Sequence, residues 1–150
     1  MSAGAHAIAI LALWLLLTGC VGQPPRIATA AAVAPALSGA GVVMDDGRSL
    51  PLRSWPSDGP PNAVLLAVHG FNDYANAFDG LGRALASAGI LTYAYDQRGF
   101  GDNPDRGRWA GSPRMVADLQ DVAALLRRRH PGLPLYLLGE SMGGALVMAA

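Results

Sequence analysis

Three short apolar runs, separated by segments with a helical pattern, set the strongest limit on what this chain can fold into. Residues 63–68 read Ala-Val-Leu-Leu-Ala-Val, and residues 90–95 and 135–138 are also largely apolar. A strand that is apolar on both faces is typical of a parallel sheet with helices on both sides. Strands that alternate with helices imply right-handed crossovers, so an α/β fold is predicted.

The segments between the runs have the spacing and end signals of helices. Residues 75–88 carry apolar side chains at helical spacing, and Gly89 follows as a C-cap. A second helix is predicted to begin with Ser112 as N-cap and Pro113 at the first helical position, and to end near His130. The expected order from residue 63 is therefore strand, helix, strand, helix, strand, and the start of a third helix.

A hairpin is expected before the alternating part. Residues 42–44 and 50–55 read as strands, and they flank Asp45-Asp46-Gly47. An Asp-Gly pair between two extended runs favours a tight turn because glycine tolerates a positive φ. Pro51 lacks an N–H donor, which predicts that its strand lies at an edge. The predicted fold class is thus a mostly parallel α/β sheet with an N-terminal antiparallel hairpin.

The N-terminal segment reads as a signal peptide over residues 1–19, followed by a flexible tether over residues 20–41 that is rich in small residues and Pro. Leu17-Thr18-Gly19-Cys20 resembles a bacterial lipobox. The resemblance implies a lipidated Cys20 that holds the protein at a membrane of the cell envelope. Residues 1–7 hold no Lys or Arg, so a non-lipid signal or anchor, and a secreted protein, stays the alternative.

Composition excludes several classes of function. The chain has 11 basic and 11 acidic residues and a net charge of zero, so no nucleic-acid partner is expected. Its single cysteine allows no disulfide within one chain. The three histidines, His6, His69 and His130, are too scattered to suggest a metal site.

The chemistry of the chain centres on Ser141. Residues 139–143 read Gly-Glu-Ser-Met-Gly, the G-x-S-x-G pattern, between a predicted strand and a predicted helix. In that context the serine stands on a tight turn with its Oγ exposed, and it is the predicted nucleophile. Two backbone N–H groups are expected to form the oxyanion hole, one from Met142 and one from Phe71, in the loop after the first buried strand.

The other polar residues near these motifs are expected to serve structure. His69 is interpreted as a residue that organises its loop and not as the catalytic base, and His130 as a solvated helix end. Glu140 is expected to make local contacts, and a Gly-rich loop near the site to be stabilised by its polar residues, which are Asp96, Arg98 and Asp102.

Three segments together resemble a known motif series. They are His69-Gly70-Phe71, residues 96–101 and residues 139–144, and they are similar to those of α/β-hydrolases of the monoacylglycerol lipase and lysophospholipase type, with an S33-type hydrolase domain. The resemblance covers roughly residues 42–150. It implies hydrolysis of a lipid-like ester, such as a monoacylglycerol or a lysophospholipid, without a cofactor.

The family's catalytic triad continues with an Asp and then a His, and neither can be assigned to a position in this chain. Residues 42–150 are therefore expected to be the N-terminal part of a hydrolase domain truncated after the serine, inactive by itself. Other hypotheses remain open. One is a peptidase, thioesterase or acyltransferase on the same scaffold, and another is a non-catalytic or inactive envelope lipoprotein. A dehalogenase or epoxide hydrolase is disfavoured because Ser141 stands where an Asp would be expected.

Overall fold

The computed structural model describes residues 33–39 and 41–150 of the 150-residue chain. The predicted signal peptide, Cys20 and most of the expected tether lie outside the described residues. The strands are β1 (Ala36–Ser38), β2 (Gly41–Val43), β3 (Ser49–Trp55), β4 (Ala63–Val68), β5 (Ile90–Tyr95) and β6 (Leu135–Gly139). The helices are the 3₁₀ helix η2 (Ala75–Phe78) and the α-helices α2 (Asp79–Ala86), α3 (Ser112–Arg129) and α4 (Met142–Ala149).

All six strands belong to one mixed sheet in the order β1-β2-β3-β5-β4-β6. β4 pairs in parallel with β5 on one side and with β6 on the other, so that Leu66 lies between Tyr93 and Leu137. β1, β2 and β3 pair antiparallel with one another, and β3 also pairs antiparallel with β5. The predicted α/β class, with a parallel part and an N-terminal antiparallel part, is confirmed.

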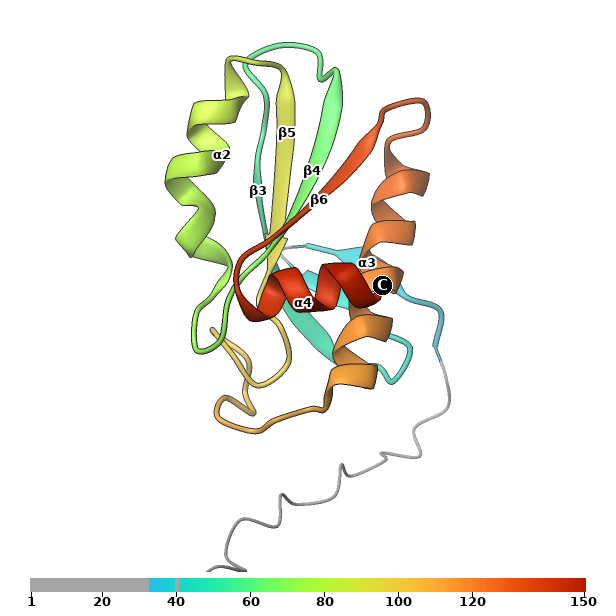
Figure 1. The fold of residues 1–150 in the computed structure, drawn as a ribbon. Helices are drawn as coiled ribbons and strands as arrows, with labels where there is room; N and C mark the ends of the chain where they lie inside the picture. The colour runs from blue at the N-terminus through green and yellow to red at the C-terminus, as the bar shows by residue number, and fades with distance from the viewer. Residues whose placement is uncertain (1–32, 40) are drawn as a thin grey trace, which may run out of the picture.

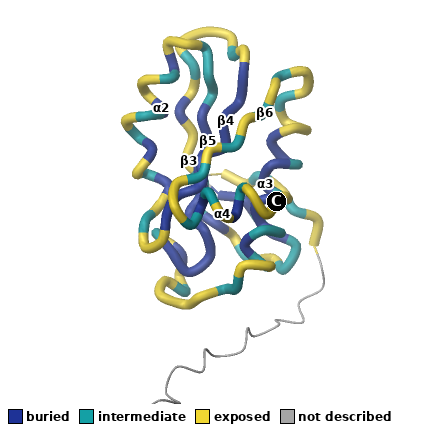
Figure 2. The backbone as a smooth tube through the Cα atoms, viewed as in Figure 1, coloured by how far each residue is buried: buried dark blue, intermediate teal, exposed yellow. Residues whose placement is uncertain are grey.

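Helices cover both faces of the parallel part, with α2 on one side and α3 on the other (Figure 1). The alternation of side chains along β4 divides the core accordingly. Leu66 and Val68 belong to a large apolar cluster that includes Leu119 of α3. Ala67 faces the other way, into a smaller cluster with Phe78. In Figure 2, β4 lies in the dark, buried centre of the molecule, and all six of its residues are buried.

The predicted hairpin is present between β2 and β3. Met44 N–H donates to Arg48 O at 2.8 Å, and Gly47 adopts a φ of +75°. The antiparallel part is larger than expected, because residues 36–38 of the expected tether form β1 and pair with β2. The boundary of the folded domain therefore lies before residue 42.

The prediction that Pro51 marks an edge strand is wrong for the sheet as a whole. β3 lies between β2 and β5, but it changes partner along its length. Residues 49–51 pair with β2 and residues 52–55 with β5. Pro51 stands at this change of partner, and its carbonyl accepts from Asp96 N–H at 2.9 Å. The missing donor is tolerated because each half of β3 pairs along one side only.

Two further expectations need correction. The strand at 135–138 was expected to be buried, but Tyr136 is 59% exposed and Leu138 36% exposed, because β6 is the outer strand of the described sheet. Helix α3 begins with Ser112 itself, and the N-cap is Gly111, whose φ of +88° suits glycine. Within the described range, no helix combines the length and apolarity that crossing a membrane requires.

Candidate active site

Three loops meet at one edge of the sheet. β4, β5 and β6 are parallel neighbours, so their carboxyl ends lie together (Figure 1). The loop after β4 carries His69-Gly70-Phe71, the loop after β5 runs from Asp96 to Gly111, and β6 leads through Glu140 into Ser141. Ligands of open α/β sheets bind outside the carboxyl ends of strands, which makes this edge the candidate site.

Ser141 lies on a strained turn between β6 and α4. Its φ is +50° and its ψ is −115°, a conformation that L-residues rarely adopt. Glycine is required on both sides of this turn because neighbouring backbone atoms leave no room for a Cβ. A Cβ on Gly139 would collide with the backbone of Gly143, and a Cβ on Gly143 would collide with the carbonyl of Val68. The sequence therefore folds into a turn that holds the serine at the N-terminal end of α4.

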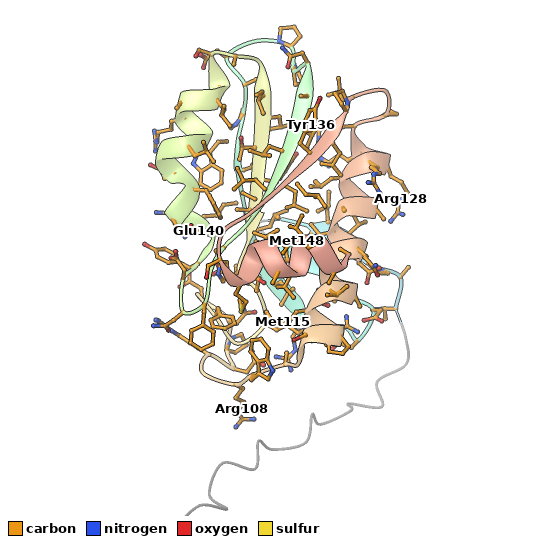
Figure 3. The ribbon with its side chains drawn as sticks, in the orientation of Figure 1. Arg108, Met115, Arg128, Tyr136, Glu140 and Met148 are labelled. Atoms are coloured by element: carbon orange, nitrogen blue, oxygen red, sulfur yellow. The ribbon has the colours of Figure 1, made fainter. Side chains whose placement is uncertain are left out.

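The loop after β4 lies directly against this turn. Glu140 N–H donates to Val68 O at 3.0 Å, and a Cβ built on Gly70 would lie 3.5 Å from the Cβ of Ser141. Glu140 itself is exposed, and its backbone joins the turn to β4 (Figure 3). Gly70, the neighbour of the predicted oxyanion donor Phe71, thus lies beside Ser141, and the other predicted donor, Met142, follows Ser141 in the chain. Neither N–H donates to a backbone acceptor within the described part of the chain.

His69 is fully buried and both of its ring nitrogens are engaged. Nδ1 lies 2.8 Å from Gly70 O, and Nε2 accepts from Gln97 N–H at 3.0 Å. Desolvation by burial lowers the pKa of His69 from its ordinary value of 6.5. A neutral imidazole with both nitrogens bonded to the backbone organises the loop, in agreement with the expectation from sequence.

His130 caps the C-terminal end of α3 and is less solvated than expected. Its Nε2 lies 3.0 Å from Tyr93 Oη, and the two rings are tilted against each other at 5.7 Å. Burial, and then the positive charge of Arg129, lower its pKa from 6.5. Neither His69 nor His130 is hydrogen-bonded to Ser141, so no histidine among the described residues is placed as its base.

The loop after β5 is held by the buried carboxylate of Asp96. One oxygen accepts from Ala75 N–H and the other from Asp102 N–H, each at 2.7 Å. Gly101 passes so close to this carboxylate that a Cβ would collide with it. The amide of Asn103 donates to three carbonyls of the same loop. The predicted loop-stabilising role of Asp96 is confirmed, whereas Asp102 contributes mainly its backbone.

Arg98 joins this loop to two distant elements. It is almost fully buried, and it donates in pairs to Asp118 of α3 and to Asp46 of the β2–β3 turn, where its Nη1 lies 2.7 Å from Asp46 Oδ2. The Arg98 guanidinium lowers the pKa of Asp46 to about 2. Arg114 of α3 adds further ion pairs to Asp118 and Asp45. The sequence indicated a structural role for Arg98, but not its partners.

A row of aromatic rings begins in the loop after β4. Phe71 contacts Phe100 edge-on at 5.3 Å between ring centroids, and Phe100 contacts Trp109 at 6.5 Å. Phe71 is 68% exposed and Trp109 54% exposed, while Phe100 between them is buried. The edge of the sheet that carries Ser141 therefore presents exposed apolar surface, a feature that no pattern in the sequence indicated.

Two features together define an α/β-hydrolase. One is the sheet with parallel strands β5, β4 and β6, and the other is the serine at positive φ between strand and helix. The chain belongs to the serine aminopeptidase S33 family, whose model matches residues 59–150.

Relatives of the chain include several lipases. The chain is 32% identical over 108 residues to the monoglyceride lipase of Homo sapiens, which covers 71% of this chain and 36% of that protein. It is 32% identical over 96 residues to the monoacylglycerol lipase of Mycolicibacterium smegmatis, with 63% and 34% covered. The chain thus spans about a third of the length of these relatives.

Solved structures agree on the fold. A thermostable carboxyl esterase from Bacillus coagulans matches with a TM-score of 0.64 at 20% identity, covering 77% of this chain and 37% of that one. A lipase in its open form matches with a TM-score of 0.62 at 25% identity, covering 76% and 39%. The predicted α/β-hydrolase fold is confirmed.

Proposed function

We propose that the protein is a serine hydrolase that cleaves carboxylic esters, with Ser141 as the nucleophile. The observation that carries this proposal is the turn at Ser141, where a non-glycine residue is held at a φ of +50° at the N-terminal end of α4. Backbone strain of this kind persists at functional sites because the surrounding structure enforces it. Membership of a family with lipase relatives supports the same conclusion.

In the proposed reaction, Ser141 Oγ attacks the ester carbonyl carbon and the carbonyl π electrons move onto oxygen. The N–H groups of Phe71 and Met142 hold that oxyanion. The bond to the alcohol oxygen then breaks, the alcohol leaves with the proton taken from Ser141, and an acyl-enzyme remains. Water hydrolyses the acyl-enzyme in the same two stages and releases the acid.

A base is needed to accept the proton of Ser141, and it lies outside the described residues. His69 is bonded through both ring nitrogens, and His130 is bonded to Tyr93. Without a base, a serine hydroxyl is a weak nucleophile, and removal of the base lowers kcat by orders of magnitude. We infer that a histidine and its carboxylate partner belong to another part of the complete protein.

The proposed substrate is a lipid-like ester, in the first place a monoacylglycerol. Two relatives are named as lipases of that substrate, and the exposed rings of Phe71 and Trp109 offer apolar surface beside the oxyanion loop. Attachment to a membrane of the bacterial envelope through a lipidated Cys20 belongs to the same proposal. It would keep the enzyme at the interface where such esters are found.

The test uses the full-length protein and its Ser141→Ala variant. We expect the wild type to be labelled by a fluorophosphonate probe and to release fatty acid from a monoacylglycerol, and we expect the variant to lose both. A loss of about 10⁴-fold or more in kcat is typical of a removed nucleophile. A folded wild type that is neither labelled nor active on esters would contradict the proposal and favour a non-catalytic envelope protein.

A second candidate uses the same acyl-transfer chemistry on a different acyl bond. The family model is described as a serine aminopeptidase, and a thioesterase domain from the curacin biosynthetic pathway matches with a TM-score of 0.55 at 26% identity. An aminoacyl anilide and an acyl thioester, assayed beside the monoacylglycerol, separate the candidates by their kcat/KM values. A preference for either over the ester would replace the proposed substrate and leave the role of Ser141 unchanged.

A further inference from the structure

One peptide unit in the site carries a predicted catalytic donor on one side and an unusual acceptor on the other. It joins Gly70 to Phe71, and no peptide bond of the described residues is cis. In a trans peptide unit the C=O and the N–H point in opposite directions within one plane. Whatever fixes the direction of the Gly70 carbonyl therefore also fixes the direction of the Phe71 N–H.

The ring of His69 holds this carbonyl, and only one form of the ring can do so. Gly70 O can only accept, so the Nδ1 atom at 2.8 Å must carry the proton. Gln97 N–H can only donate, so the Nε2 atom at 3.0 Å must be unprotonated. The two contacts together select the neutral Nδ1–H tautomer. A proton on Nε2 would face the Gln97 N–H and break the second contact.

Gln97 holds the same segment a second time. Its side-chain Nε2 donates to His69 O at 2.6 Å, and both residues are at most 1% exposed. The peptide units before and after Gly70 are thus both bonded to groups that cannot turn freely in the core. The lowered pKa of His69, caused by burial, agrees with a ring that stays neutral.

We propose that His69 and Gln97 form a positioning pair that aims the Phe71 N–H at the oxyanion of the reaction. The pair touches no reacting atom and acts through the Gly70–Phe71 peptide unit. This inference rests on the proposed function, because an oxyanion forms only if Ser141 attacks a carbonyl group.

Two variants of nearly equal size separate the two nitrogens of His69. The amide nitrogen of Asn lies where Nδ1 lies in histidine, so His69→Asn can keep the donor to Gly70 O and loses the acceptor for Gln97. The amide oxygen of Gln reaches the place of Nε2, so His69→Gln can keep the acceptor and loses the donor. Both variants lose the buried ring and its contact with Phe100 at 5.7 Å.

The measurement is kcat and KM for ester hydrolysis by the full-length protein, with thermal unfolding of each variant. Removal of a whole oxyanion donor costs about 10²–10³-fold in kcat, and a misdirected donor is expected to cost at least about tenfold. We expect this loss in His69→Gln with KM little changed, and kcat within about threefold of the wild type in His69→Asn. Equal losses in two variants of equal thermal stability would overturn the proposal, because a purely structural role predicts that result.

A second measurement does not depend on activity. Nitrogen NMR of histidine-labelled protein is expected to show His69 as the Nδ1–H tautomer, and to show a mostly neutral ring at pH 6.5, because burial lowers the pKa of His69. The Nε2–H tautomer, or an imidazolium at neutral pH, would overturn the positioning pair. Wild-type protein that carries the expected tautomer but hydrolyses no ester would contradict the proposed function, so the two failures are distinguishable.

Discussion

β4 and β6 are neighbouring parallel strands with nearly the same apolar character, but their side chains are buried to different extents. All six residues of β4 are buried, whereas half-buried and exposed positions alternate along β6. Figure 3 shows Tyr136 on β6 and Met148 on α4, and these side chains are 59% and 85% exposed. β4 has a strand on each side, whereas β6 pairs only with β4 in the part of the chain that the structure describes. Burial therefore follows the place of a strand in the sheet, which hydrophobicity alone does not reveal.

The candidate site is built across these two strands. The end of β4 supplies the buried, fully bonded segment at His69, and the end of β6 supplies the strained turn at Ser141. The turn at Ser141 contacts the end of β4 in two ways. The backbone of Gly143 packs closely against the carbonyl of Val68, and Glu140 N–H donates a hydrogen bond to Val68 O. The buried inner strand thus leads into the loop of the proposed oxyanion donor Phe71, and it also contacts the turn of the proposed nucleophile on its outer neighbour.

The same substitution on each strand tests this difference in burial most directly. Leu66→Ala is expected to lower the free energy of unfolding by about 2–5 kcal/mol, because Leu66 is fully buried in the core and a cavity remains. Leu138→Ala, on a side chain that is 36% exposed, is expected to cost less than about 1 kcal/mol. Urea unfolding of both variants measures the difference. Equal costs would mean that β6 is covered in the protein in solution.

A second pair of variants tests the contact between the strands. Gly143 is the second residue of α4, and Gly80 is the second residue of α2. Gly143→Ala is expected to destabilise the protein by about 1–3 kcal/mol and to displace Ser141, because its Cβ would collide with Val68 O. A displacement of about 1 Å can lower kcat about 10²-fold.

Gly80→Ala is the matched control for that substitution. No atom lies within 4 Å of its added Cβ, so it is expected to stabilise α2 by up to about 1 kcal/mol and to leave activity unchanged. Thermal unfolding and ester hydrolysis of both variants test the pair. A Gly143→Ala protein as active as the wild type would show that the turn does not depend on its approach to β4.

Local signals in the sequence predicted the elements whose cause is local. Gly47 marked the β2–β3 turn, Pro113 marked the start of α3, and the glycines around Ser141 marked the turn that the structure contains. The role of His69 also followed from its place beside Gly70 at a strand end. These features depend on backbone conformation and close approach over a few residues, which residue type determines.

Features that depend on distant partners could not be predicted in the same way. Arg98 meets Asp46, 52 residues before it, and Asp118, 20 residues after it. β1 forms from small residues that read as a tether, and it is a strand only because β2 lies beside it. The exposure of Tyr136 depends on the order of the strands. In each case the deciding contact lies outside any local pattern.

The smallest expected effect concerns the strain stored where β6 ends. A glycine adopts a φ of +50° without the cost that a Cβ imposes, so Ser141→Gly should relieve strain that Ser141→Ala retains. The strain is about 1–3 kcal/mol, and the greater freedom of glycine in the unfolded chain offsets about 1 kcal/mol of it. We therefore expect Ser141→Gly to unfold with a free energy about 1 kcal/mol above that of Ser141→Ala. Both variants lack the hydroxyl of the proposed nucleophile, so the difference in their urea unfolding reports the backbone strain less the contribution of glycine to the unfolded chain. If Ser141→Ala were the more stable of the two, the turn would be relaxed in solution, and the observation that carries the proposed function would lose its force.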